Sequence, residues 1–100
     1  MYKTFLVTYE LTNKAKDYNA FYEELKKTDD WWHYIEASWL LKTGESNEAL
    51  LRRLATHIDK DDRLLIVDIT SNKFAGSMPD EAWEWDFFTN APKKRLPDLW

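Results

Sequence analysis

Three carboxylates, Glu10, Glu36 and Asp68, are the first side chains whose types and spacing suggest chemistry. Period-two alternation allows all three to lie on one face of a β-sheet. Metal-dependent hydrolysis of a phosphodiester needs carboxylates gathered around one or two ions, about 4 Å apart when there are two. The first enzymatic hypothesis is therefore a Mg²⁺-dependent nuclease, with Glu10 as its candidate catalytic and metal-binding residue.

Other catalytic chemistry has no clear signature in the chain. His33 and His57 have no second His or Cys at ligand spacing, so structural roles are expected for both. The glycines are isolated, which excludes a phosphate-binding loop. There is no cysteine, which excludes disulfides, thiolate zinc sites and cysteine nucleophiles. No cofactor is expected, apart from Mg²⁺ if the nuclease hypothesis holds.

Alternating and helical patterns predict the elements that position these side chains. Residues 4–11 read as a strand, and Asp17 is a plausible N-cap for a helix with Tyr18, Phe21, Tyr22 and Leu25 on its apolar side. Ser46 or Asn47 can cap a second helix, and the apolar run 64–69 predicts a buried strand. Pro79 fits the start of a third, short helix.

The segment 31–43 holds three of the six tryptophans and is apolar on both predicted faces. It is long for one strand, and Ala37–Ser38 is the best place for a turn that would divide it into two. Whether it forms one strand or two is left open. A stretch that is apolar on both sides is typical of a strand or hairpin covered on both faces.

The order of elements predicts an α+β domain with the ferredoxin-like βαββαβ arrangement. This fold is an antiparallel sheet with two helices on one face. Here a short extra C-terminal helix and an irregular tail follow it. The predicted domain spans residues 1–88, and the tail spans 89–100.

The second face of such a sheet has no helix to cover it. Alternation predicts that this open face carries large apolar side chains, and an apolar patch of that kind usually marks an association site. A homodimer is the most economical way to cover it. The predicted interface residues are Leu6, Trp32, Tyr34, Leu40, Leu64 and Ile66.

Charge and hydropathy limit the partners. The net charge of −4 disfavours strong nucleic-acid binding, which depends on neutralising phosphates. The basic cluster Lys93, Lys94 and Arg95 in the tail supplies the candidate nucleic-acid contacts. No apolar stretch reaches the roughly 20 residues of a membrane-spanning helix, and no secretory pattern is seen, so a cytoplasmic protein is expected.

Three stretches carry a resemblance to known proteins: Val7–Leu11, Trp31–Leu40 and Ile58–Val67, the last with its Asp-Lys-Asp-Asp turn. Together they resemble the small bacterial proteins labelled "SinR family". These are similar in fold to the small ferredoxin-like subunit of the CRISPR adaptation complex, CRISPR-associated protein two. The resemblance covers roughly residues 3–86. The chain shows no helix-turn-helix pattern of the kind a repressor would need.

The resemblance implies a ferredoxin-like homodimer. Some members of the CRISPR subunit family are reported as metal-dependent nucleases, and others bridge DNA as scaffolds. Their candidate metal ligand is an Asp at the end of the first strand, and the matching residue here is Glu10, whose longer side chain departs from that pattern.

Topology also argues against joining the three carboxylates. In the ferredoxin order Glu10 and Asp68 would lie at opposite ends of neighbouring strands, and Glu36 would lie two strands from Glu10. The leading hypothesis is therefore a non-catalytic, homodimeric binding or scaffold protein. The alternatives are a nuclease that uses Glu10 from both protomers and a nucleic-acid-binding module without catalysis.

Overall fold

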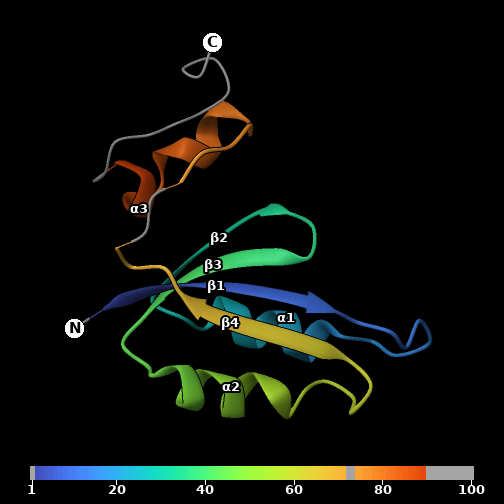
Figure 1. The fold of residues 1–100 in the computed structure, drawn as a ribbon. Helices are drawn as coiled ribbons and strands as arrows, with labels where there is room; N and C mark the ends of the chain where they lie inside the picture. The colour runs from blue at the N-terminus through green and yellow to red at the C-terminus, as the bar shows by residue number, and fades with distance from the viewer. Residues whose placement is uncertain (1, 72–73, 90–100) are drawn as a thin grey trace. The chain divides into compact units, whose positions relative to one another are not determined.

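The computed structural model describes residues 2–71 and 74–89. The chain divides into two compact units, Met1–Ile69 and Thr70–Trp100. The first unit carries the sheet and two helices, and the second carries two short helical segments (Figure 1). In chain order the elements are β1 (Lys3–Glu10), α1 (Asn19–Lys26), β2 (Asp30–Ile35), β3 (Ser38–Thr43), α2 (Asn47–Ala55), β4 (Arg63–Asp68), the 3₁₀ helix η1 (Asp80–Glu84) and α3 (Asp86–Thr89).

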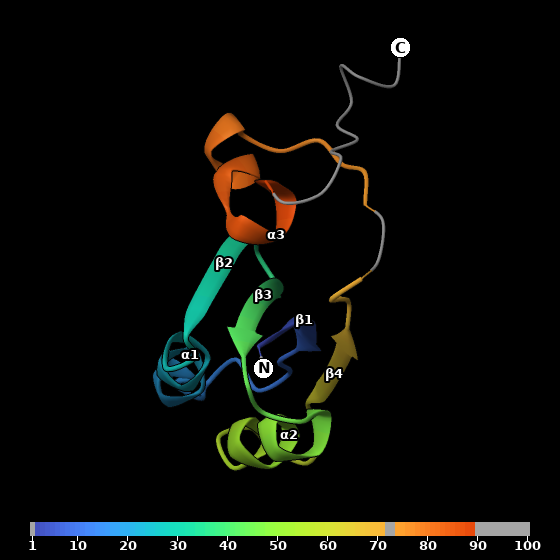
Figure 2. The same ribbon diagram turned by 90° about the vertical axis from the view of Figure 1, so that its left-hand side faces the viewer.

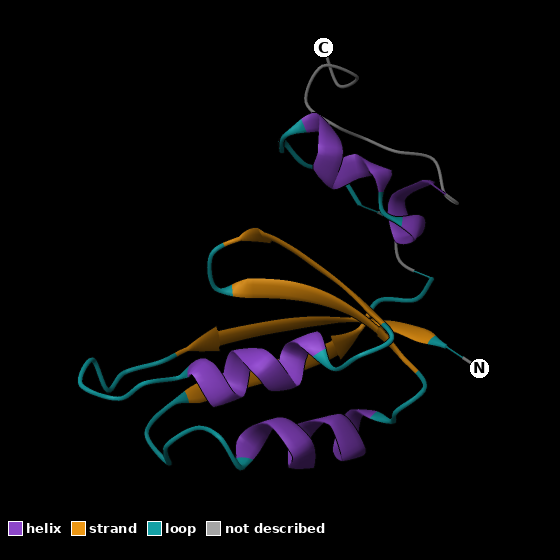
Figure 3. Ribbon diagram, turned by 180° about the vertical axis from the view of Figure 1, so that it is seen from behind, coloured by secondary structure: helices purple, strands orange, loops and turns teal. Residues whose placement is uncertain are grey.

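The sheet of the first unit has the strand order β2-β3-β1-β4. Each neighbouring pair is antiparallel. Figures 2 and 3 show α1 and α2 on the same side of this sheet, which leaves its other side without a helix from the first unit. The domain is thus α+β with a four-stranded antiparallel sheet, an arrangement compatible with the ferredoxin-like fold.

The hydrophobic core lies between the sheet and the two helices. Alternate residues of the two central strands point into it, because successive side chains of a strand point to opposite faces. Tyr9 closes one end of this core, with its ring edge-on to Phe21 at 5.1 Å between centroids. The buried members of the core are Phe5, Val7, Tyr18, Phe21, Leu25, Trp39, Leu41, Leu50 and Leu54.

The observed helix caps agree in part with the N-caps predicted from the sequence. Ser46 caps α2 as predicted, since its side chain accepts a hydrogen bond from the backbone N–H of Ala49 at 3.1 Å. Helix α1 begins later than predicted, at Asn19 with Tyr18 at the N-cap. Asp17 still accepts a hydrogen bond from the first helical amide, that of Asn19, at 2.9 Å.

Arg53 joins the two helices to the loop after β3. Its guanidinium binds the Glu45 carboxylate through two hydrogen bonds of 3.0 and 2.8 Å and also reaches the Glu24 carboxylate at 3.1 Å. Hydrogen bonds from Arg53 lower the pKa of the Glu45 carboxyl. Arg53 therefore faces the junction of the helices.

The tryptophan-rich segment forms a hairpin whose turn is Glu36–Ala37. The two-strand alternative is thus the observed one, with the turn one residue earlier than expected. An irregularity between Trp32 and Ile35 shifts the register of β2 on β3. It pairs Ile35 with Ser38, so Ile35 leaves the face predicted from simple alternation.

The prediction that Leu64 and Ile66 line the open face is wrong. They pair with Tyr9 and Val7 and pack against the core on the helix side of the sheet. The open face of β4 carries their neighbours Leu65 and Val67. The reason is the composition of β4, which is apolar at successive positions, so alternation alone does not fix which side is inward.

The second unit is held together by aromatic rings. Phe88 lies edge-on to both Phe74 and Trp83, with ring centroids 4.8 and 5.2 Å apart. The short helix predicted near Pro79 is present as η1, which begins at the following residue. The predicted contacts Lys93, Lys94 and Arg95, and residues 90–100 of the tail, lie outside the described residues.

None of the helices in the described part of the chain has the length and apolar character needed to cross a membrane.

Asp62 ties together the two loops at one end of the sheet. One carboxylate oxygen accepts from the backbone N–H of Thr12 at 2.7 Å, and the other accepts from the N–H of Asp59 at 2.8 Å. The Tyr18 hydroxyl donates to the same carboxylate at 2.9 Å. Burial alone would raise the pKa of Asp62, but these hydrogen bonds to the charged form lower it to about 2. Asp62 thus links the β1–α1 loop, helix α1 and the α2–β4 turn.

We predict that this carboxylate makes the protein sensitive to acid. Its pKa is lower in the folded chain than the ordinary 3.8, so its contribution to stability is complete above pH 4 and is lost as the pH falls toward 2. Asp62→Asn should lower the urea midpoint at neutral pH. Between pH 4 and 2, the midpoint of the variant should fall less steeply than that of wild type. Asp61→Asn is the matched control and should leave both unchanged. Equal acid dependence of wild type and Asp62→Asn would contradict the prediction.

Candidate functional site

Two shallow hollows meet at Tyr9, on the edge of the first unit where α1 approaches the β2–β3 hairpin. The first has a volume of about 330 Å³ and is lined by α1 and by hairpin residues that include His33 and Trp39. The second has a volume of about 450 Å³ and lies at the end of β1, beside Glu10. Both are lined by Tyr9, Tyr22 and Glu36. We refer to the two together as the Tyr9 hollows.

The Tyr9 hydroxyl is the polar centre of this region. It accepts a hydrogen bond from the Trp39 indole N–H at 3.0 Å and donates to the backbone carbonyl of Glu36 at 3.2 Å. Partial burial raises the pKa of Tyr9, with further contributions from Tyr22 and Glu36, and the Trp39 N–H opposes them. The hydroxyl therefore stays protonated as a donor and joins β1, β3 and the hairpin turn.

His33 forms part of the wall of the first hollow. Its ring stacks on the Trp39 indole at 3.9 Å between centroids and 12° between planes. Its Nε2 lies 2.9 Å from the Glu36 carbonyl oxygen, which can only accept. Nε2 therefore carries a proton and donates to the same carbonyl that Tyr9 binds. These contacts fix the ring against the hairpin.

One face of α1 supplies the opposite wall. Asn19, Tyr22, Glu23 and Lys26 recur at helical spacing and all line the first hollow. The Lys26 ammonium lies 3.6 Å from the Glu23 carboxylate and 5.8 Å from the centroid of the Trp31 ring. Lys26 is thus drawn toward Glu23 and Trp31.

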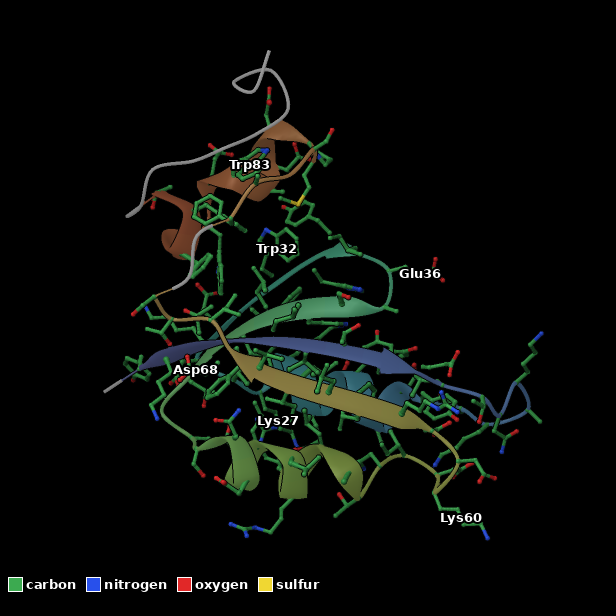
Figure 4. All side chains as sticks on the ribbon, in the orientation of Figure 1. Lys27, Trp32, Glu36, Lys60, Asp68 and Trp83 are labelled. Carbon is green, nitrogen blue, oxygen red and sulfur yellow. The ribbon has the colours of Figure 1, made fainter. Side chains whose placement is uncertain are left out.

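Two of the three predicted carboxylates, Glu10 and Glu36, line the second hollow. Glu36 lies in the turn between β2 and β3, whereas simple alternation placed it inside a strand. Figure 4 shows Glu36 at this turn and Asp68 at the far end of the sheet.

The predicted separation of Glu10 from Asp68 is confirmed. Glu10 pairs with Arg63 at one end of β4, whereas Asp68 pairs with Phe5 at the other. That spacing corresponds to about 17 Å along the strands. Because it pairs with Phe5, Asp68 also has the parity of the helix side, which corrects the expectation that all three carboxylates share the open face.

Glu10 itself is an exposed carboxylate at the end of its strand. Arg63 is its ionic neighbour, with Nε 3.7 Å from the carboxylate. His57, for which a structural role is expected, lies 3.8 Å from the Glu24 carboxylate, near the Arg53 ion pairs. Within residues 2–71 and 74–89, no group of three or more His, Cys, Asp or Glu side chains is placed to hold a metal ion.

The open face of the sheet is the second surface of interest. Register places Leu6, Leu40, Trp32 and Val67 in one row across the four strands. Of the predicted interface residues in this row, Trp32 and Leu40 are buried within the chain itself, so they do not form an exposed patch. Figure 4 shows Trp32 projecting from β2 on the side away from α1 and α2. Tyr34, the other predicted interface residue of β2, is exposed, with its ring 5.3 Å from that of Trp32.

Two exposed aliphatic residues of β4 on this face are not among the predicted interface residues. Leu65 is 58% exposed and Val67 is 37% exposed, both on the edge strand β4. Their side of the sheet is set by the pairing of β4 with β1, because a partner of Leu6 or Thr8 must share their face. Pairing register requires the three-dimensional structure, so composition alone could not assign it.

Comparisons with protein-family models, with curated proteins and with solved structures find no match to this chain.

We predict that the Tyr9 hydroxyl stabilises the fold. Tyr9→Phe leaves the buried Trp39 N–H without its acceptor and should lower the free energy of unfolding by about 1–2 kcal/mol. Tyr34→Phe on the same hairpin is the control and should change it by less than about 0.5 kcal/mol. Urea denaturation followed by tryptophan fluorescence measures both. A Tyr9→Phe variant as stable as wild type would contradict the prediction, because the Trp39 N–H would then have found another acceptor.

Proposed function

We propose that the chain is a non-catalytic, homodimeric binding or scaffold domain with a ferredoxin-like architecture, paired through the open face of its sheet. The observation that carries the proposal is the exposure of Leu65 and Val67 on that face of an edge strand. Exposed apolar side chains on an edge strand promote association with another chain, and most soluble oligomers are symmetric homo-oligomers.

The size of the apolar contribution indicates how far the interface must extend. Complete burial of one Leu or Val side chain contributes about 1.5–3 kcal/mol, so the exposed parts of Leu65 and Val67 contribute only a few kcal/mol in a dimer. Association costs at least about 4 kcal/mol in lost freedom. The interface therefore has to include further exposed apolar groups, and Tyr34 and Ile35 of the hairpin, 45% and 50% exposed, supply them.

The charges on this face suit a second copy of the same chain. Glu10 and Arg63 lie opposite each other at one end of the strands, and Asp30 and Lys42 pair at the other. Each of these two pairs therefore combines one positive and one negative side chain. A two-fold axis places such a surface on its own copy without gathering like charges, as an isologous interface requires.

The interface is tested by placing a charge on the exposed strand. Leu65→Glu should weaken dimerisation at least about 100-fold, because association would then bury an unpaired carboxylate. Leu51→Glu is the matched control, since Leu51 is 45% exposed but lies on α2, on the helix side of the sheet. Sedimentation equilibrium gives the masses, and circular dichroism checks that both variants stay folded.

Two results would contradict the proposal. One is a wild-type chain that is monomeric at concentrations up to about 100 μM, well within the range of specific association. The other is a Leu65→Glu variant that keeps the wild-type dimer mass.

A further inference from the structure

The Tyr9 hollows combine aromatic walls with an excess of negative charge. Tyr9 and Tyr22 contribute aromatic rings to the lining of both hollows, whereas one face of the Trp39 indole in the first hollow is covered by the His33 ring. Glu10, Glu23 and Glu36 contribute three carboxylates, and Lys26 contributes one ammonium, which leaves a formal charge of −2 on the lining side chains. Aromatic rings and carboxylates are the two kinds of group that attract an organic cation.

The Glu36 carboxylate is the free acceptor of this region. Its backbone carbonyl binds Tyr9 and His33, which hold the hairpin turn in place. Glu36 is among the residues that line both hollows, and its exposed carboxylate makes no hydrogen bond or ion pair with any other described residue. Glu23 and Glu10, by contrast, have Lys26 and Arg63 as ionic neighbours. A carboxylate on a fixed turn is thus presented to a ligand.

From these features we propose that the Tyr9 hollows bind a guanidinium group, such as the side chain of an arginine residue. A planar guanidinium stacks on aromatic rings and binds a carboxylate through two parallel hydrogen bonds, whereas an ammonium acts as a point charge. The volume of the first hollow, about 330 Å³, lies at the lower end of the range for small-ligand sites and suits one side chain. The site does not depend on pairing through the open sheet face.

The Trp39 indole N–H reports directly on this site. Trp39 lines the first hollow, and its N–H binds the Tyr9 hydroxyl, so a group entering the hollow changes the environment of that proton. In a two-dimensional ¹H–¹⁵N NMR titration, N-acetyl-arginine amide should shift the Trp39 indole resonance in a saturable way. The uncharged isostere N-acetyl-citrulline amide should not, and N-acetyl-lysine amide should bind more weakly.

Glu36→Gln removes the free carboxylate and keeps the size of the side chain. The variant should bind N-acetyl-arginine amide about fivefold more weakly, the upper range for an exposed charge pair. Glu48→Gln, an exposed carboxylate on α2 outside the hollows, is the control and should bind as wild type does. The Trp39 indole resonance of each free variant should stay near its wild-type position, which shows that the hairpin is intact.

Three results would overturn the assignment. The first is no shift of the Trp39 indole resonance with N-acetyl-arginine amide. The second is an equal response to the citrulline or lysine compound, which would remove the role of the guanidinium. The third is unchanged affinity in Glu36→Gln, which would remove the role of this carboxylate.

Discussion

The hydrogen bond from the Trp39 indole N–H to the Tyr9 hydroxyl is the interaction around which the first unit is arranged. Trp39 is only 2% exposed, so its N–H needs an internal acceptor, and an unpaired buried donor would be costly. Tyr9 supplies that acceptor and donates its own hydrogen bond to the Glu36 carbonyl. One side-chain pair thus fixes the central strand β1, its neighbour β3 and the hairpin turn.

This arrangement makes the two sides of the sheet unequal. On the helix side, the aromatic rings of Tyr9, Phe21 and Trp39 fill the space below α1 and leave the Tyr9 hollows at its rim. On the other side, Leu65 and Val67 of β4 stay exposed. The two proposals follow from this inequality: recognition of a guanidinium at the rim, and pairing with a second copy through the open face.

Much of the secondary structure could be predicted from the sequence, because local signals specify it. The Ser46 cap, the helical spacing of Phe21 and Leu25, and the β-branched content of 64–69 each depend on near neighbours in the chain. Local signals do not decide which face of a strand packs on the core when both faces are apolar. Leu64 and Leu65 are chemically identical, and only the register of β4 on β1 decides that the first packs on the core.

Individual residues of the candidate site could be predicted from the sequence, but their arrangement around the hollows could not. Glu10 and Glu36 were recognised as carboxylates of interest, yet the hollow that both line is formed by a hairpin whose turn lies one residue earlier than expected. The walls of the hollows come from β1, α1 and the hairpin, which are distant in sequence. The Asp62 contacts likewise join loops that are far apart along the chain. Such long-range contacts leave no local pattern to read.

The pairing of two copies through the open sheet face is the central claim, and an isotope-filtered NOE experiment tests it most directly. Copies labelled with ¹³C on their Leu and Val methyls are mixed with unlabelled copies. We expect intermolecular cross-peaks from the methyls of Leu65 and Val67 and none from those of Leu51. A dimer whose intermolecular cross-peaks omit Leu65 and Val67, or include Leu51 in their place, would contradict the claim.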